Sequence, residues 1–396
     1  MKKIASHPIV YRGSVKNLRV IKKPTQGSAG VYLFEFTDDY SIFDYGKMPD
    51  TLNNKGSSLA MMSAFIFERM ERPKTWKELE DSGIWKGLQD NALRTSLGSS
   101  PLLKELKKHG MKTHYIGLRD KHGKRVRCDD LKEPTNIIEV KAFNIVRPSK
   151  GVIGGNAVWN YTALHPGLRN YLIPLENVFR FGVPRGSSFL KRNPDYYPWL
   201  GLTRMPQEGQ WLPFPIIEYF SKLEPGDRLL PLESAVNFSG LPTEKFQEMR
   251  DLTFLSALYL YNFFARAGIE LWDGKLEFSR TNGIILSDAV TPDELRLVKD
   301  SIQISKEPIR QYYRKYHSRF IEDIAKAKEI SLGKEGKIGD IMRNDLGRTP
   351  ERMEPAFKKA AEDMYVALTV ETTGLSLFPE ARPLREVIER IKAFGL

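Results

Sequence analysis

The sequence has little of what disulfide-stabilised, metal-binding and membrane-spanning proteins need. Cys128 is the one cysteine among 396 residues, so no intrachain disulfide can form. The six histidines show no HxxxH spacing for a transition metal. The longest apolar tract, residues 252–265, is interrupted by Thr253, Ser256 and Asn262 and is shorter than the roughly 20 residues of a membrane span. We therefore expect no membrane segment, no secretory signal and a reducing compartment, the cytoplasm.

The composition is that of a soluble globular protein, with 41% hydrophobic and 28% charged residues. Sixty-one Lys and Arg against 49 Asp and Glu give a net charge of +12. Such an excess suits either nucleic acid or small anionic substrates. The cations are dispersed among acidic residues, and no aromatic RNA-binding motif or zinc-finger spacing occurs, so nucleic acid is the weaker alternative. A homo-oligomer is among the assemblies that this composition allows.

Alternating strand and helix signals divide the chain into segments. Strands are expected over 31–36, 113–118 and 136–146, and helices over 59–70, over 242–266 with an end at Gly268, and from 306 onward. Glycines 151, 154 and 155 predict a flexible loop rather than a dinucleotide-binding loop, since no strand and helix flank them in the required order. We expect a β-rich lobe over 1–147, an insertion or connection over 148–172, a second lobe over 173–315 and a helical extension over 316–396.

The most informative stretch is a predicted hairpin around Asn282-Gly283, a dipeptide that favours a two-residue type I′ turn. Counting outward from this turn places Glu277 directly opposite Asp288. Because side chains alternate along a strand, one face is expected to be polar and the other apolar. The two faces carry Asp273, Lys275 and Glu277 on one side, and Trp272, Leu276 and Phe278 on the other.

Two carboxylates facing each other destabilise a sheet unless a cation lies between them. One interpretation is a structural ion cluster in which Lys275 is that cation. The other is a Mg²⁺ site, because an all-oxygen site of one or two carboxylates suits magnesium bound together with nucleotide phosphates. Arg296 follows a turn at Pro292 and has the geometry to hold a phosphate or carboxylate.

Taken in order, these residues and several further motifs resemble the SAICAR synthetase family, the phosphoribosylaminoimidazole-succinocarboxamide synthases of purine biosynthesis. The resemblance covers residues 9 to about 315. Its motifs lie at 11–16 (YRGSVK), 34–44, 55–67, 110–115 (GMKTHY), 180–192, 221–227 (SKLEPGD), 267–278, 288–296 and the pair Lys306 and Arg310. The block from Ala267 through Arg296 is the strongest of these.

The resemblance implies an α+β, two-lobed, ATP-grasp-like fold, here with an added C-terminal helical segment. It also implies an ATP-dependent carbon–nitrogen ligase. In such an enzyme the carboxylate of carboxyaminoimidazole ribonucleotide (CAIR) receives the γ-phosphoryl group of ATP, and L-aspartate attacks the acyl phosphate to form an amide. ATP and Mg²⁺ are the implied cofactors, and all partners are small molecules.

The same resemblance implies roles for individual residues in this chain. Nucleotide contacts are expected from Arg12, Ser14, Lys16, Lys275 and Glu277, and metal binding from Glu277 and Asp288. Substrate contacts are expected from Arg180, Ser187, Asp227, Asp273 and Arg296, and catalytic contacts near the transferring phosphoryl group from Lys275, Lys306 and Arg310.

The chain departs from the family pattern at several substrate positions. The family's His-Asp is here Gly226-Asp227-Arg228, its Asp-Glu is Asp288-Ala289, and its lysine after the first glycine is Ser14. These departures keep open a related ATP-dependent amide ligase or kinase that acts on another carboxylate and amine.

Overall fold

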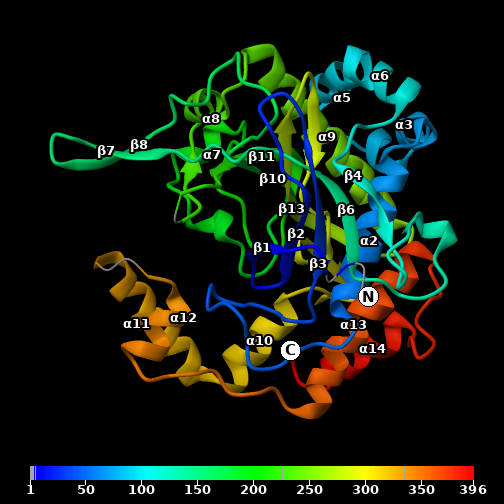
Figure 1. Cartoon of the computed structure of the whole chain (residues 1–396), viewed down its shortest axis with the longest axis vertical. Helices are drawn as coiled ribbons and strands as arrows, with labels where there is room; N and C mark the ends of the chain where they lie inside the picture. Colours follow the sequence, from blue (N-terminus) through cyan, green and yellow to red (C-terminus); the bar gives the residue numbers. More distant parts are fainter. Residues whose placement is uncertain (1–3, 5, 225, 334–335) are drawn as a thin grey trace.

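Two antiparallel β-sheets carry most of the strands in the computed structural model, which describes residues 4, 6–224, 226–333 and 336–396 (Figure 1). The first sheet has six strands in the order β1-β2-β3-β6-β4-β5. They are β1 (Ile9–Arg12), β2 (Lys16–Lys22), β3 (Gly30–Phe36), β4 (Tyr115–Arg119), β5 (Arg125–Val126) and β6 (Ile137–Ala142). The three strands predicted in this region are confirmed, with ends shifted by a few residues.

The second sheet is organised around β13, an inner strand of 11 residues that pairs with β10, β15, β14 and β9. Its strands are β9 (Tyr171–Leu172), β10 (Leu175–Gly182), β11 (Trp211–Ser221), β12 (Leu229–Leu230), β13 (Glu270–Arg280), β14 (Ile284–Ser287), β15 (Leu295–Lys299) and β16 (Ile302–Gln303). Gly274 lies at the middle of β13, where a Cβ atom would be 2.5 Å from Leu295 and 2.6 Å from Phe179. Only glycine lets these two side chains pack over the strand.

The two sheets are joined by backbone hydrogen bonds from residues directly before β4 and shortly after β6. The amide of His114 donates to the carbonyl of Leu286 at 2.9 Å, and the amide of Leu172 donates to the carbonyl of Asn144 at 2.9 Å. The end of β14 therefore lies beside the first sheet, and residues that follow β14 can reach side chains of β2.

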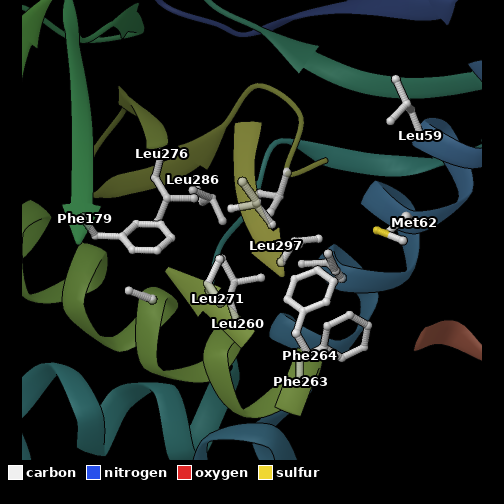
Figure 2. Close-up of a cluster of buried hydrophobic side chains, with 14 of the residues drawn as sticks. Leu59, Met62, Phe179, Leu260, Phe263, Phe264, Leu271, Leu276, Leu286 and Leu297 are labelled. Atoms are coloured by element: carbon white, nitrogen blue, oxygen red, sulfur yellow. The ribbon is translucent and has the colours of Figure 1, made fainter. Parts of the chain in front are cut away.

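Helices α2 and α9 cover the joined sheets. The helices before the C-terminal region are α2 (Lys55–Met70), α3 (Pro73–Leu79), α4 (Gly83–Lys86), α5 (Asn91–Ser99), α6 (Pro101–His109), α7 (Tyr196–Trp199), α8 (Leu232–Ser239) and α9 (Thr243–Ala265), with short 3₁₀ turns η1 (Cys128–Asp130), η2 (Ser188–Lys191) and η3 (Pro292–Glu294). Figure 2 shows Leu59 and Met62 of α2 in one buried cluster with Phe263 and Phe264 of α9 and Leu297 of β15. The two helices predicted here are confirmed, and Gly268 ends α9 with a positive φ of 64°.

The predicted helices after residue 306 are confirmed as α10 (Glu307–Tyr316), α11 (Ser318–Gly333), α12 (Ile338–Asn344), α13 (Pro355–Thr373) and α14 (Leu384–Lys392). Helix α13 packs directly against α2, and the Thr369 hydroxyl donates to the Ser58 carbonyl at 3.3 Å. This contact brings the C-terminal region next to the first turn of α2. None of the helices described is long and apolar enough to cross a membrane.

Residues 149–160 form a β-hairpin, so the prediction of a flexible loop was wrong. Strands β7 (Ser149–Ile153) and β8 (Asn156–Asn160) pair antiparallel, and the hairpin extends away from the rest of the molecule (Figure 1). The turn is Gly154-Gly155, whose φ angles of 55° and 81° are the positive values that a two-residue primed turn needs. Gly151 lies within β7, so the glycines shape this hairpin and do not interrupt it.

The register of the hairpin formed by β13 and β14 also differs from the prediction, by one residue. Arg280 pairs with Ile284, which leaves a three-residue loop, and Glu277 therefore faces Ser287 instead of Asp288. The amide of Thr281 donates to the carbonyl of Gly283 at 2.9 Å and closes this longer loop. Neither Asn282 nor Gly283 has a positive φ, so the type I′ turn is absent at this position.

Candidate active site

One face of β13 carries a row of charged side chains, as the alternation predicted. Lys275 lies at the middle of the row, and its Nζ is 2.9 Å from Glu277 Oε1, 2.6 Å from Glu176 Oε1 and 3.3 Å from Glu294 Oε2. Lys222, which directly follows β11, approaches the same oxygen of Glu277 at 2.5 Å. Two lysines and three carboxylates thus share one partly buried position, which we call the β13 cluster.

Asp288 joins this cluster from the end of β14. Its backbone adopts a left-handed conformation with φ 56°, which turns the chain immediately after the strand. The Asp288 carboxylate pairs with Lys16 Nζ at the start of β2, and Lys16 also lies 4.4 Å from the centre of the Phe34 ring. The structural reason is the junction of the sheets, where Leu286 of β14 bonds to residues directly before β4 and Asp288 then reaches Lys16.

The charges of the β13 cluster hold one another in their ionised forms. Burial alone would lower the pKa of Lys275, but the carboxylates of Glu277, Glu294 and Glu176 raise it above its ordinary value. Burial alone would raise the pKa of the Asp288 carboxyl, but Lys16, Lys222 and Lys275 lower it below its ordinary value. The lysines therefore stay cationic and available to an anionic ligand.

A second group of charges lies at the other end of the same face. Arg180 of β10 donates from Nε to Glu218 at 2.6 Å and from Nη1 to Asp273 at 2.9 Å. Arg192 donates to the other oxygen of Glu218 at 2.9 Å, and Arg296 Nε lies 3.7 Å from Asp273. We call this set the arginine group.

The arginine group retains unused donors. Arg192 Nη2 and Arg296 Nη1 are both buried and have no hydrogen-bond partner within the part of the chain that the structure describes. A buried guanidinium N–H without a partner is unfavourable, and a phosphate or carboxylate group satisfies it well. These two atoms therefore indicate an anion site beside Arg180.

A third set of contacts, centred on Asp293, links helix α13 to the site. Asp293 accepts a hydrogen bond from Lys55 Nζ at 2.9 Å and another from the Tyr365 hydroxyl at 2.8 Å. Lys306 Nζ lies 3.7 Å from the same carboxylate. Burial would raise the pKa of Asp293, but Lys306 and Lys55 lower it below its ordinary value. Because Asp293 directly precedes Glu294, this contact fixes one side of the β13 cluster.

The structure brings together most of the residues singled out in the sequence. Lys16, Lys275, Glu277 and Asp288 lie in the β13 cluster, Arg180, Asp273 and Arg296 in the arginine group, and Lys306 beside Asp293. Five of the predicted residues remain at the edge of these groups, each in a different local setting.

The five remaining residues make few contacts with the two charged groups. Arg12 and Ser14 lie at the turn between β1 and β2, and their side chains make no hydrogen bond or ion pair to any residue that the structure describes. The Ser187 hydroxyl accepts from the amide of Phe189 at 3.3 Å and begins η2. Arg310 pairs with Glu307 of its own helix, and Asp227 is exposed in the turn before β12.

Several residues of the site were not singled out from the sequence. Lys222, Arg192, Lys55 and Asp293 lie inside the quoted motifs, so the motifs themselves held the signal. Glu176 and Glu218 come from β10 and β11 and lack a local signal, because only strand pairing brings them to β13. Tyr365 lies beyond the motifs altogether, on α13.

The carboxylates fit a magnesium ion that is shared with phosphates. Mg²⁺ prefers oxygen ligands and commonly uses one or two carboxylates together with substrate phosphates. Glu277, Asp288 and Glu294 are three such oxygen donors around Lys275. Among the described residues, no three acidic, histidine or cysteine side chains are grouped closely enough to form a metal site by themselves. A metal bound partly through its nucleotide is the arrangement that this donor set allows.

These cations, held by carboxylates along one strand where two antiparallel sheets meet, have the composition of a site for phosphate-bearing substrates in an α+β enzyme. A family model described as SAICAR synthetase matches residues 9–328. A protein of Archaeoglobus fulgidus, provisionally named phosphoribosylaminoimidazole-succinocarboxamide synthase, is 31% identical and covers 96% of this chain and 98% of its own length. The chain belongs to the SAICAR synthetase family, as the sequence motifs predicted.

Two further comparisons agree. The phosphoribosylaminoimidazole-succinocarboxamide synthase of Thermoplasma acidophilum is 26% identical, covering 79% of this chain and 86% of that protein. The solved structure of the Saccharomyces cerevisiae SAICAR synthase complexed with SAICAR aligns with a TM-score of 0.52 and 19% identity, covering 93% of this chain and 95% of that one. At that identity the likeness shows a shared fold, which confirms the predicted fold class.

Proposed function

We propose that this chain joins the carboxylate of CAIR to the amine of L-aspartate in an ATP-dependent reaction that yields SAICAR, ADP and phosphate. Support comes from family membership and from a relative that aligns along nearly the whole of both chains. The observation that carries the proposal is the β13 face, where Lys275 and Lys222 lie at one end and Arg180 and Arg296 at the other. Two phosphate-bearing substrates need two such cationic ends, and β13 with its neighbouring strands carries both.

The first step makes the carboxylate reactive. A CAIR carboxylate oxygen attacks the γ-phosphorus of ATP, the bond to the β–γ bridging oxygen breaks, and ADP leaves with that electron pair. The protein's task in such a transfer is mainly positioning and neutralisation of charge. Lys275, Lys222 and Lys16 would contact the nucleotide phosphates, with Arg12 and Ser14 at the β1–β2 turn covering them.

The second step forms the amide. The aspartate amine attacks the acyl carbon, inorganic phosphate leaves, and the nitrogen loses a proton. In this scheme Arg180, Ser187 and Arg296 anchor the ribonucleotide phosphate, and Asp227 and Asp273 orient the substrate. Lys306 and Arg310 would lie near the phosphoryl group or the carboxylates of aspartate. The unpartnered N–H groups of Arg192 and Arg296 are the donors that such a phosphate would satisfy.

Magnesium would be held by Glu277 and Asp288, with Glu294 nearby. When bound, the ion would neutralise charge on the β- and γ-phosphates. Lys16, Lys222 and Lys275, which pair with these carboxylates, would then contact phosphate oxygens instead of the carboxylates.

The test is ADP release with ATP, Mg²⁺, CAIR and L-aspartate, with one component omitted at a time. We expect turnover only with all four. Positional isotope exchange in ATP labelled at the β–γ bridge, with CAIR present and aspartate absent, would report the acyl phosphate. ADP release with an unaltered requirement for CAIR but none for aspartate, together with a stable phosphorylated product, would instead identify a kinase.

The variant Glu277→Gln tests the site itself. We expect kcat to fall at least about 100-fold, the effect of losing one electrostatic contact near a reacting phosphoryl group. The matched control is Glu105→Gln, an equal charge change on the exposed face of α6. Full activity in Glu277→Gln would contradict the assignment of the nucleotide end.

A further inference from the structure

A cavity of about 520 Å³ lies outside the candidate active site, between the last turns of α2 and α9, helix α3 and the end of α13. Its volume is in the range of small-molecule sites. Four cations line it: Arg69, Arg72, Lys74 and Arg266. Two acidic residues line it as well, Glu78 and Glu371, so positive charge predominates.

The cations of this cavity are poorly neutralised. Arg69 has no hydrogen bond or ion pair from its side chain to any residue that the structure describes, and its guanidinium lies 4.6 Å from the centre of the Phe65 ring. Lys74 and Arg266 share Glu78 at 3.5 and 3.9 Å, which are long distances for exposed side chains. Most of the positive charge is therefore available to a ligand.

Tyr259 supplies an independent sign of a ligand. The residue is only 7% exposed, lines the cavity, and its buried hydroxyl has no hydrogen-bond partner among the described residues. Burial raises the pKa of this hydroxyl, while the charges of Arg69, Arg266 and Arg72 act to lower it. Of these arginines, Arg72 contacts Asp129 at 3.5 Å, whereas Arg69 has no such partner among the described residues. A buried hydroxyl without a partner is unfavourable unless a ligand satisfies it.

We propose that this cavity is a second ligand site, which binds the phosphate group of a small molecule. Arg69 and Arg266 would hold the phosphate oxygens, since a guanidinium fork matches phosphate geometry. The Tyr259 hydroxyl would donate a further hydrogen bond. Phe65 and Phe263, whose ring centres are 6.0 Å apart and whose planes are inclined by 41°, give the cavity an apolar wall for the base of a nucleotide.

The cavity is distant from the β13 cluster. Lys55 stands at the first turn of α2 and contacts Asp293, whereas Arg69 stands in the last turn, so roughly 21 Å of helix separates them. None of the residues lining the cavity belongs to the β13 cluster or the arginine group. Binding here and binding at the candidate active site can therefore be changed separately.

The experiment is calorimetric titration of the full chain with inorganic phosphate and with adenosine monophosphate, at constant ionic strength. The variants are Arg69→Gln with Arg266→Gln, and Tyr259→Phe alone. The control is Lys104→Gln with Lys108→Gln, which removes the same charge from the exposed face of α6. If the cavity is the site, only the cavity variants should bind one equivalent of ligand more weakly than the wild type does.

We expect the double arginine variant to weaken that binding at least about tenfold and Tyr259→Phe about fivefold, the effect of one hydrogen bond. Turnover with saturating substrates should stay unchanged in the double variant. If adenosine monophosphate binds at least tenfold more tightly than phosphate, the aromatic wall contributes and the ligand is a nucleotide; equal affinities identify phosphate itself. An unchanged affinity of this site in the double variant, or an equal weakening in the control, would overturn the proposal.

Discussion

The β13 cluster and the α2–α9 cavity both collect positive charge, but they hold it in opposite ways. In the β13 cluster each lysine contacts a carboxylate, as Lys275 contacts Glu277 at 2.9 Å. In the cavity Arg69 has no carboxylate partner among the described residues, and Arg266 has a distant one at 3.9 Å. One region is neutralised internally, and the other carries an excess of charge.

The difference bears on what each region requires from a ligand. Side chains locked in ion pairs are oriented before substrate arrives, and this preorganisation favours a chemical step in which charge moves. The paired carboxylates can also accept a metal. Unpaired arginines have no such fixed geometry and repel one another, so a bound anion relieves the repulsion. We therefore associate the paired region with catalysis and the unpaired region with binding alone.

The largest expected effect comes from breaking a buried pair. Arg180 is 6% exposed and lies between Glu218 and Asp273, so Arg180→Met leaves two buried carboxylates without their main partner. We expect the free energy of unfolding to fall by about 3 kcal/mol, the lower end for a broken buried pair, because Arg192 and Arg296 remain nearby. Urea denaturation measures this loss, and we expect the m-value to stay unchanged.

The matched control for Arg180→Met is Arg228→Met. Arg228 also pairs with a buried glutamate, Glu224 at 2.7 Å, but the Arg228 side chain is itself 47% exposed. Water screens a half-exposed cation, so we expect a smaller loss than in Arg180→Met. Equal losses in the two variants would show that burial of the arginine does not change the strength of its ion pairs.

A smaller effect is expected from His114, which is buried between the edges of Phe34 and Phe67 beside Asp288. Burial lowers its pKa to about 3. The unfolded chain therefore binds a proton below pH 6.5 that the folded chain does not, and stability is lost as the pH falls from 6.5 toward 3. At pH 5 this proton binding lowers the free energy of unfolding by about 2 kcal/mol.

The measurement compares the free energy of unfolding at pH 8 and pH 5 in the wild type and in His114→Gln. The variant should lose about 2 kcal/mol less between these two pH values than the wild type does. His109→Gln, which removes an exposed histidine from α6, should keep the wild-type dependence. A wild-type dependence in His114→Gln would mean that His114 becomes protonated in the folded protein.

The sequence predicted the charged face of β13 but misplaced its partner strand. Alternation is a local property, so Lys275 and Glu277 could be placed on one face from spacing alone. The register depended on the loop, and a three-residue loop closed by Thr281 competes with the two-residue turn that Asn282-Gly283 favours elsewhere. Gly154-Gly155, which was assigned to a flexible loop, forms the two-residue turn instead.

The residues that pair with these charged side chains could not be predicted from local sequence patterns. Glu176, Glu218 and Tyr365 reach the site only through pairing with β10 and β11 or packing of α13, contacts that join distant parts of the chain. Collinear motifs predicted Arg180, Asp273 and Arg296 as a set because relatives share their order. The cavity gave no motif, since only the packing of α3 against α9 brings Arg266 to the three cations at 69–74.

The smallest expected effect separates the cavity from the β13 cluster most directly. Arg266 is 66% exposed and lies among like charges, so Arg266→Gln relieves repulsion and breaks only a weak contact to Glu78. We expect the free energy of unfolding without phosphate to stay equal or rise by up to about 0.5 kcal/mol at low salt. At 0.5 M salt the gain should vanish, because screening removes the repulsion. A loss comparable with that of Arg180→Met would mean that Arg266 is neutralised within the fold, and the contrast between the two regions would not hold.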